Sequence, residues 1–236
     1  MKFKNFLTKH KAKILSLFII MFSAITLAAC GKNKFELGDY LIEKREHLFT
    51  ANDSLYSVTF STGMREKDYN FDGIINEQIP FGVLTITRND NLPLANDKYS
   101  YIVTINDQTY SGFLEKANNN SYADDLEANI VGDEKINVQI SFTGYTFNKD
   151  LEHSSSQFQV DCDSAIKIAQ KELGDDLKNL ISDKNNKIEV VTKIMKDHSS
   201  EDLKSYNWYV GIISTNGNTM GVLIDANSGN IIAKKI

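Results

Sequence analysis

The sequence predicts an α+β fold, in which an all-β N-terminal region precedes a smaller region with one helix on an antiparallel sheet. Two changes of period along the chain support this prediction. Between residues 50 and 150, apolar and polar residues alternate in short runs, as they do in half-buried β-strands. After residue 160 the apolar residues recur every three or four positions, as on one face of an α-helix, and alternation then returns.

Residues 1–29 have the layout of a secretory signal peptide. Five lysines and no acidic residue precede an apolar run from Ile14 to Ile25. This run has about 12 residues, fewer than the ~20 that a membrane-spanning helix needs. Small residues follow it and lead to Cys30, which is the order expected of a secreted precursor.

The residues Leu27-Ala28-Ala29-Cys30 resemble the lipobox of bacterial lipoproteins. The resemblance implies cleavage between Ala29 and Cys30 and a diacylglyceryl group on the Cys30 sulfur. Because each buried methylene contributes ~0.8 kcal/mol, two or more acyl chains would hold the protein on the outer face of the cell membrane. The alternatives are an uncleaved anchor and an ordinary signal peptide followed by a coincidental cysteine.

Composition restricts the classes of partner. The formal net charge of −5 becomes about −10 when the five lysines of residues 1–29 are removed. Such an acidic surface argues against nucleic acid and against a broad electrostatic hold on anionic lipid. With Cys30 assigned to the lipid, Cys162 is the one cysteine left, so the mature chain has no internal disulfide. Two prolines and many Asn, Lys and Ile residues indicate a low-GC Gram-positive bacterium.

Residues 37–150 predict an antiparallel, sandwich-like β domain behind a short tether at 30–36. Aromatic and β-branched residues alternate with polar ones, and Asn, Asp and Gly separate the runs. The runs are 55–61, 81–86, 99–105, 109–114 and 136–147. About six strands fit a sandwich or a partly open barrel. Residues 39–49 stay open between a helix capped by Asp39 and an edge strand.

Residues 151–157 are small and polar and predict a linker to a second domain at 158–236. One helical stripe follows, made of Cys162, Ala165, Ile166, Ala169 and Leu173. Asp161 or Asp163 can cap this helix, and Gly174 can interrupt or end it. Strand-like runs then occupy 188–195, 206–214, 220–224 and 231–236.

Residues 158–236 resemble a PepSY-type domain. The matching residues are Ala165-Ile166, Ile168-Ala169, Trp208-Tyr209-Val210, Val222, Ile224-Asp225-Ala226, Gly229 and Ile231-Ile232. The resemblance covers about a third of the chain and implies one helix on an antiparallel sheet of three or four strands. It also implies a role in binding or restraining peptidases, and it offers no catalytic residue.

Catalytic motifs are missing from the sequence. It contains no HExxH, CxxC or GxSxG motif and no phosphate-binding glycine loop. The mature chain has His47, His153 and His198, and no two of them have the spacing of metal ligands. We therefore predict a protein that is not an enzyme and that holds no cofactor.

Asp68, Asn70, Asp72 and Asn76 form a weak calcium candidate. Their side-chain oxygens follow the first, third, fifth and ninth positions of a calcium loop, with Gly73 at the sixth. Ile79 stands at the twelfth position, where such a loop needs a glutamate. The alternative is a polar β-turn, so we predict no metal site and keep these four residues as a candidate.

These features together predict an extracytoplasmic, lipid-anchored and non-catalytic module. Its expected partners are the membrane, through the lipid on Cys30, and a surface or secreted peptidase or its peptide. The alternatives are a lipoprotein that binds a small molecule, peptide or glycan in a groove of the β region, and a structural envelope protein.

We expect the Cys30→Ser variant to lose its lipid, because the Cys30 sulfur is the attachment atom. Metabolic labelling with an alkyne fatty acid, followed by mass spectrometry, measures this directly. Wild-type protein should carry the label at Cys30, and the control variant Cys162→Ser should carry as much. Equal labelling of Cys30→Ser and wild type would contradict the lipoprotein hypothesis.

Overall fold

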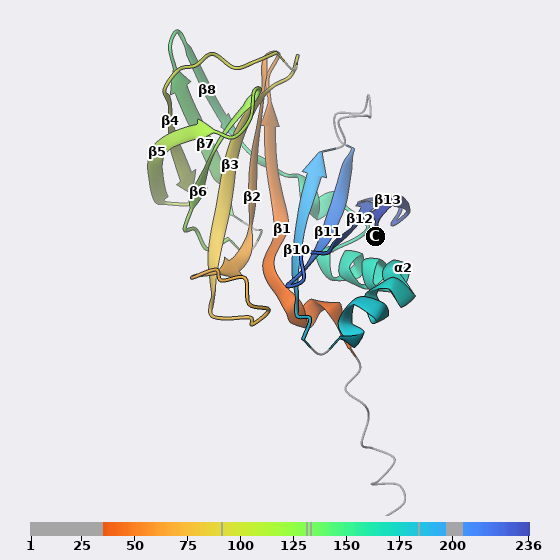
Figure 1. Cartoon of the computed structure of the whole chain (residues 1–236). Coiled ribbons are helices and arrows are strands. Elements are labelled where there is room, and N and C mark those ends of the chain that lie inside the picture. Colours follow the sequence, from red (N-terminus) through yellow and green to blue (C-terminus); the bar gives the residue numbers. More distant parts are fainter. Residues whose placement is uncertain (1–34, 91, 131, 133, 184, 197–204) are drawn as a thin grey trace, which may run out of the picture. The chain divides into compact units, whose positions relative to one another are not determined.

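One mixed β-sheet runs through residues 37–236, and a kinked helix packs against one end of it (Figure 1). The computed structural model describes residues 35–236 except 91, 131, 133, 184 and 197–204. Ala29, Cys30 and His198 lie outside the described residues. The α+β class is confirmed. The finer division into a sandwich and a second domain is not, and it stays a prediction.

The strands are β1 Leu41–Asn52, β2 Tyr56–Glu66, β3 Gln78–Arg88, β4 Tyr99–Ile105, β5 Gln108–Lys116, β6 Ser121–Leu126, β7 Ile136–Phe142, β8 Tyr145–Asp150, β9 Glu152–His153, β10 Ile188–Lys196, β11 Tyr206–Ser214, β12 Thr219–Asp225 and β13 Ile231–Lys235. Their order in the sheet is β13-β12-β11-β10-β1-β2-β3-β6-β5-β4-β7-β8, and β9 pairs with β1. All described neighbours are antiparallel except β1 and β10, which are parallel.

Strand β1 joins the two parts of the sheet, because it pairs with β2 on one side and with β10 on the other. The sequence left residues 39–49 open between a helix and an edge strand. In the structure, Leu37–Tyr40 is a 3-10 helix (η1), and the following residues form an inner strand. The edge-strand alternative is therefore wrong, because β10 pairs with the second edge of β1. Lys44, for example, pairs with Thr192, which lies 148 positions later in the sequence.

A bulge in β1 sets the register with β2. Arg45 pairs with Gly63, whereas His47 pairs with Thr62, so one residue of β1 is left without an opposite partner. A Cβ atom on Gly63 would lie 1.8 Å from the carbonyl oxygen of Lys44. The close approach of the two backbones at the bulge therefore requires glycine.

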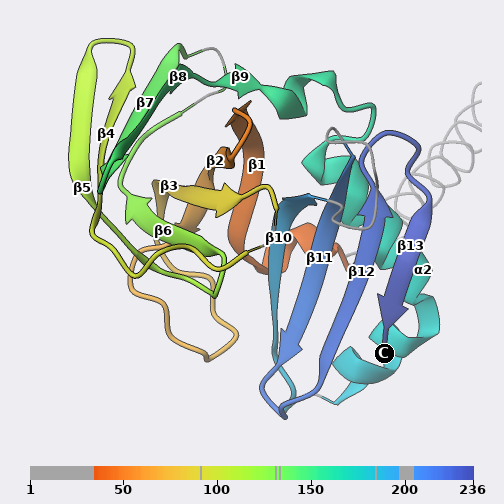
Figure 2. The same cartoon turned by 90° about the horizontal axis from the view of Figure 1, so that it is seen from above.

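The strands β1–β8 curl around a core that side chains fill (Figure 2). Phe49, Phe60, Tyr99 and Phe147 are among its largest fully buried residues. On β2, Val58 and Phe60 point into this core, so by alternation Ser57, Thr59 and Ser61 point to the other face of the sheet. The interior of β1–β8 is therefore filled by side chains.

Helix α2, Cys162–Ser182, packs on the C-terminal strands with the predicted apolar stripe buried. The Asp161 carboxylate accepts a hydrogen bond from the Ser164 backbone N–H at 2.7 Å, which confirms the cap and lowers the pKa of that carboxyl. Gly174 has φ +41° and kinks the helix, which continues to Ser182. Trp208 is buried, and its indole N–H donates to the Val160 carbonyl oxygen at 2.8 Å.

The predicted linker is attached to β1. The Ser155 hydroxyl accepts a hydrogen bond from the Leu48 N–H at 2.9 Å, and the Ser154 and Thr50 hydroxyls lie 2.7 Å apart. Residues 152–153 form β9, and Ser154–Gln157 form a 3-10 helix, η2. This stretch is therefore ordered along β1 instead of being a free spacer.

No helix in the described part of the chain combines the length and the apolar character that a bilayer-spanning segment needs.

We expect Gly63→Ala to lower the free energy of unfolding by about 2 kcal/mol or more, because the new methyl group would collide with the backbone at Lys44. Gly38→Ala is the matched control, since a Cβ there meets nothing within 4 Å. Urea denaturation of both variants measures the difference. Equal stability of the two variants would show that the bulge tolerates a side chain.

Candidate functional site

Small hydroxyl side chains gather on the face of β1, β2 and β3 that is turned away from the core. Cross-strand pairing places Thr50 beside Thr59, Thr59 beside Thr85, and Ser57 beside Thr87. Two neighbouring hollows of about 480 and 530 Å³ lie over this face and share Tyr206 of β11. We call them together the polar groove; its lining includes Thr50, Asn52, Ser57, Thr59, Ser61, Thr85, Lys193, Met195, Tyr206 and Asn227.

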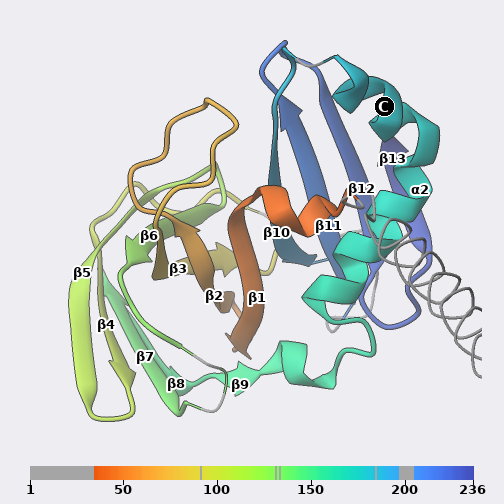
Figure 3. The ribbon, with the colours of Figure 1, turned by 90° about the horizontal axis from the view of Figure 1, so that it is seen from below.

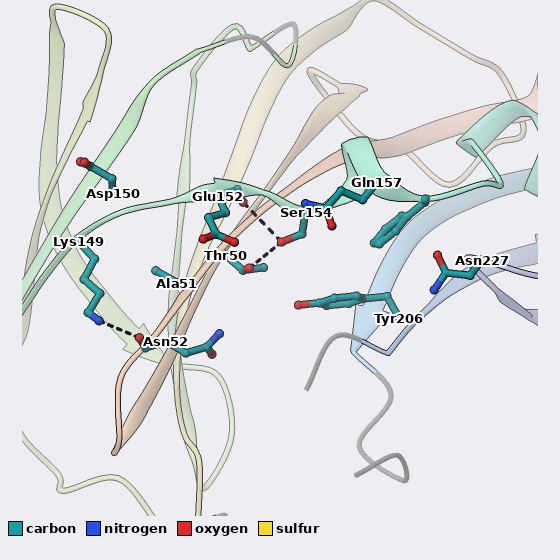
Figure 4. Close-up of a pocket in the computed structure, with 11 residues that line it drawn as sticks. Thr50, Ala51, Asn52, Lys149, Asp150, Glu152, Ser154, Gln157, Tyr206 and Asn227 are labelled. Carbon is teal, nitrogen blue, oxygen red and sulfur yellow. Dashed lines mark hydrogen bonds between the residues drawn. The ribbon is translucent and has the colours of Figure 1, made fainter. Parts of the chain in front are cut away.

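The smaller hollow lies between the end of β1, the β8–η2 stretch and Tyr206 (Figure 4). Some of its polar groups bond to one another. Lys149 donates through Nζ to the Asn52 carbonyl oxygen at 2.9 Å, and the Ser154 hydroxyl contacts that of Thr50 at 2.7 Å. The side-chain amides of Gln157 and Asn227 also line this hollow.

The larger hollow is lined by the cations Arg45, Arg88, Lys193 and Lys196, of which all but Arg88 lie on the adjacent strands β1 and β10. In the parallel ladder Lys44 pairs with Thr192, so the next residues, Arg45 and Lys193, lie side by side. Arg45 donates through Nε to the Glu43 carboxylate at 2.6 Å. Lys193 is half-buried, and no carboxylate of the described residues lies within 4.0 Å of its ammonium group.

Burial lowers the pKa of Lys193, the neighbouring Arg45 charge lowers it further, and Glu43 opposes both effects. The charged ammonium form of Lys193 is therefore less stable in the groove than it would be in water. An anion bound in the groove would restore a counter-charge, so this part of the groove is suited to a carboxylate or a phosphate.

Ser61 adds an unsatisfied group at the floor of the groove. Its hydroxyl oxygen is buried and has no hydrogen-bond partner among the described residues. Leaving such a group unpaired costs about 1–3 kcal/mol. This hydroxyl is therefore a local cost to stability beneath the groove.

The calcium candidates Asp68, Asn70, Asp72 and Asn76 all lie in the loop between β2 and β3. The Asp72 carboxylate accepts hydrogen bonds from the Ile74 N–H at 2.8 Å and from the Asn70 amide at 3.0 Å. The Asn76 amide donates to the Ile74 carbonyl oxygen at 3.4 Å. Among the described residues, no three His, Cys, Asp or Glu side chains are placed to hold a metal ion. The calcium hypothesis stays a prediction.

The structure brings together two histidines that the sequence analysis treated as unrelated. The ring centres of His47 and His153 are 5.4 Å apart, and Phe49 stacks on His153 at 4.5 Å. This contact depends on the pairing of β9 with β1. The sequence spacing could not have indicated this contact, because the end of β1 and all of β2–β8 separate His47 from His153.

Cys162 has the character of a buried apolar residue. Burial raises the pKa of its thiol to about 12, and its sulfur lies 3.8 Å from the Thr192 hydroxyl. The thiol therefore stays protonated and weakly nucleophilic at neutral pH.

We expect Ser61→Ala to leave the free energy of unfolding unchanged or to raise it by up to about 1 kcal/mol, because it removes an unpaired buried hydroxyl. Thr50→Val is the matched control: it breaks the Ser154 contact and should cost about 1 kcal/mol. Thermal unfolding compares the two. A clear loss of stability in Ser61→Ala would mean that its hydroxyl has a partner.

Comparison with known proteins concerns the C-terminal part of the chain. Residues 163–235 match the family model of PepSY, described as the peptidase propeptide and YPEB domain. Neither the curated proteins nor the solved structures give a significant match. The match spans nearly all of α2 and the strands β10–β13, and it confirms the PepSY resemblance. The chain therefore carries a PepSY domain, a type linked to peptidase propeptides and peptidase regulation and not typically catalytic.

Proposed function

We propose that the protein is a non-catalytic regulatory module that binds a surface or secreted peptidase, or a peptide segment of one, at the outer face of the cell membrane. The PepSY domain at residues 163–235 is the observation that carries this proposal. The signal-like leader and the lipobox-like residues before Cys30 support the location. The lipid on Cys30 holds the module on the membrane.

The polar groove is the binding surface in this proposal. One wall comes from the PepSY strands, with Lys193, Met195 and Tyr206, and the other from β2 and β3, with Thr59 and Thr85 among others. An occupant therefore contacts both parts of the sheet. Such a shared surface explains why a PepSY domain would be joined to the preceding strands by a continuous ladder.

The chemistry of the groove indicates the kind of segment it takes. Lys193 and Arg45 favour a carboxylate, and the hydroxyl groups provide donors and acceptors for peptide groups. Met195 is 42% exposed and gives an adaptable apolar contact. A volume of about 530 Å³ suits a few residues of an extended peptide. We therefore propose an acidic peptide segment as the occupant.

A second candidate function is the binding of a small anionic ligand of the cell envelope. Lys193 favours it, because its ammonium group has no carboxylate partner among the described residues and attracts any anion, polypeptide or not. The interior of β1–β8 does not serve this function, since residues such as Phe60 and Tyr99 fill it.

We expect Lys193→Glu to reduce capture of the peptidase partner at least about tenfold, equivalent to ~1.4 kcal/mol, because it replaces an attractive charge by a repulsive one. A photo-crosslinking amino acid at Met195 measures capture on intact cells, with mass spectrometry of the products. Lys171→Glu is the control, since it makes the same charge change on an exposed position of α2.

Loss of crosslinks in Lys193→Glu alone would support the groove as the binding surface. Equal crosslinking in both variants would place the partner elsewhere. Crosslinks to low-molecular-weight material, with no peptidase or peptide recovered, would favour the second candidate function.

A further inference from the structure

The loop of residues 67–77, between β2 and β3, holds three large apolar side chains in solvent. Tyr69, Phe71 and Ile74 are 55%, 42% and 51% exposed. They lie within six positions of one another in a loop otherwise rich in polar residues. Large apolar side chains exposed close together in one loop make it a candidate for contact with an apolar partner.

A buried carboxylate holds this loop in place. Glu189 of β10 is fully buried, and it accepts hydrogen bonds from the Tyr69 hydroxyl at 2.9 Å and from the Gly73 N–H at 2.8 Å. Gly73 has φ +66°, and a Cβ atom there would lie 2.2 Å from the Lys187 Cβ. The loop is therefore fixed against β10, and it cannot simply fold its apolar side chains inward.

The topology places this loop at the end of the sheet where the chain enters the fold. Strands β1 and β10 are parallel and begin at the same end, with Leu41 opposite Val190. Because β2 runs antiparallel to β1, it finishes there, and the Gln78 amide donates to the Leu41 carbonyl oxygen at 2.7 Å. Figures 1 and 3 show the loop at the same end as η1, which precedes β1.

Chain length then limits the distance between this end and the membrane. Leu37, the first residue of the fold, is buried, and its N–H donates to the Gln170 side chain at 2.6 Å. Six residues, 31–36, separate it from Cys30, so even a fully extended chain spans only about 25 Å. The turn at the other end of β1, which contains Leu55, lies a further ~40 Å away along a 12-residue strand.

We propose that the loop of residues 67–77 docks on the lipid bilayer, with Phe71 and Ile74 inserted at the interface and Tyr69 held against Glu189 beside them. This inference rests on the lipid anchoring of Cys30 in the proposed function and adds a second point of contact. Aromatic side chains favour the membrane interface. A weak contact suffices, because a short tether raises the effective concentration of the loop at the surface to the millimolar range.

The charges of the loop define the kind of contact. Asp68 and Glu77 are exposed, and Lys67 lies 3.8 Å from Glu77, so the loop has no excess positive charge for anionic lipid. The Asp72 carboxylate is occupied by bonds within the loop. The contact is therefore apolar, and added salt should not release it.

Bromolipid quenching of tryptophan fluorescence tests this proposal. The lipidated protein is reconstituted into phosphatidylcholine vesicles with the substitution Phe71→Trp or, as the matched control, Leu55→Trp, which is 47% exposed in the wild type and lies at the other end of β1. Trp208 is buried in both variants and gives a common background. We expect brominated lipid to reduce the added Phe71→Trp emission about twofold and to leave that of Leu55→Trp unchanged.

Vesicle flotation, measured on the same samples, reports anchoring through Cys30 independently of the loop. Flotation with selective quenching of Phe71→Trp supports the docking. Flotation with equal quenching in the two variants, or quenching that 0.5 M salt abolishes, overturns it and leaves the anchor intact. Failure to float overturns the lipid anchoring of the proposed function, and the docking with it.

Discussion

The parallel pairing of β1 with β10 is the interaction on which the rest of the structure depends. It makes one sheet from the strands β1–β8 and the C-terminal strands β10–β13. It also places Arg45 beside Lys193, which creates the charged part of the polar groove. The same pairing brings the start of β10, with its buried Glu189, to the end of the β2–β3 hairpin. The polar groove and the position of the loop of residues 67–77 therefore both depend on the pairing of β1 with β10.

Burial of polar groups around β1 shows that the sheet is not arranged for stability alone. Ser61 has a buried hydroxyl oxygen with no hydrogen-bond partner among the described residues, and Lys193 is half-buried beside another cation. Each of these lowers the free energy of unfolding. Ser61 lies on β2, whose opposite face contributes to a well-packed apolar core that offsets the cost. Ser61 and Lys193 both line the polar groove, where we propose that the protein binds its partner.

Local patterns were enough to predict much of the fold. The stripe from Cys162 to Leu173 is buried as predicted, and most strands were found by alternation. Strand β6 was missed, because Ser121–Leu126 contains two adjacent aspartates and forms through pairing with β3. The sequence analysis treated residues 136–147 as one run. In the structure, Gly144 has φ +77° and lies in the turn between β7 and β8. The polar groove could not be predicted, since it depends on which strands meet across long sequence separations.

The long separation between β1 and β10 has a consequence for how the chain acquires its structure. If the protein crosses the membrane from its N-terminus, β1 and its hairpin partner emerge well before residues 188–196. Until those residues arrive, one side of β1 presents unpaired N–H and C=O groups, and such an edge recruits strands from other molecules. Closing so long a loop is also slow. A chain exported in this order would therefore pass through a period of vulnerability to aggregation, which would end only when its C-terminal third had been delivered.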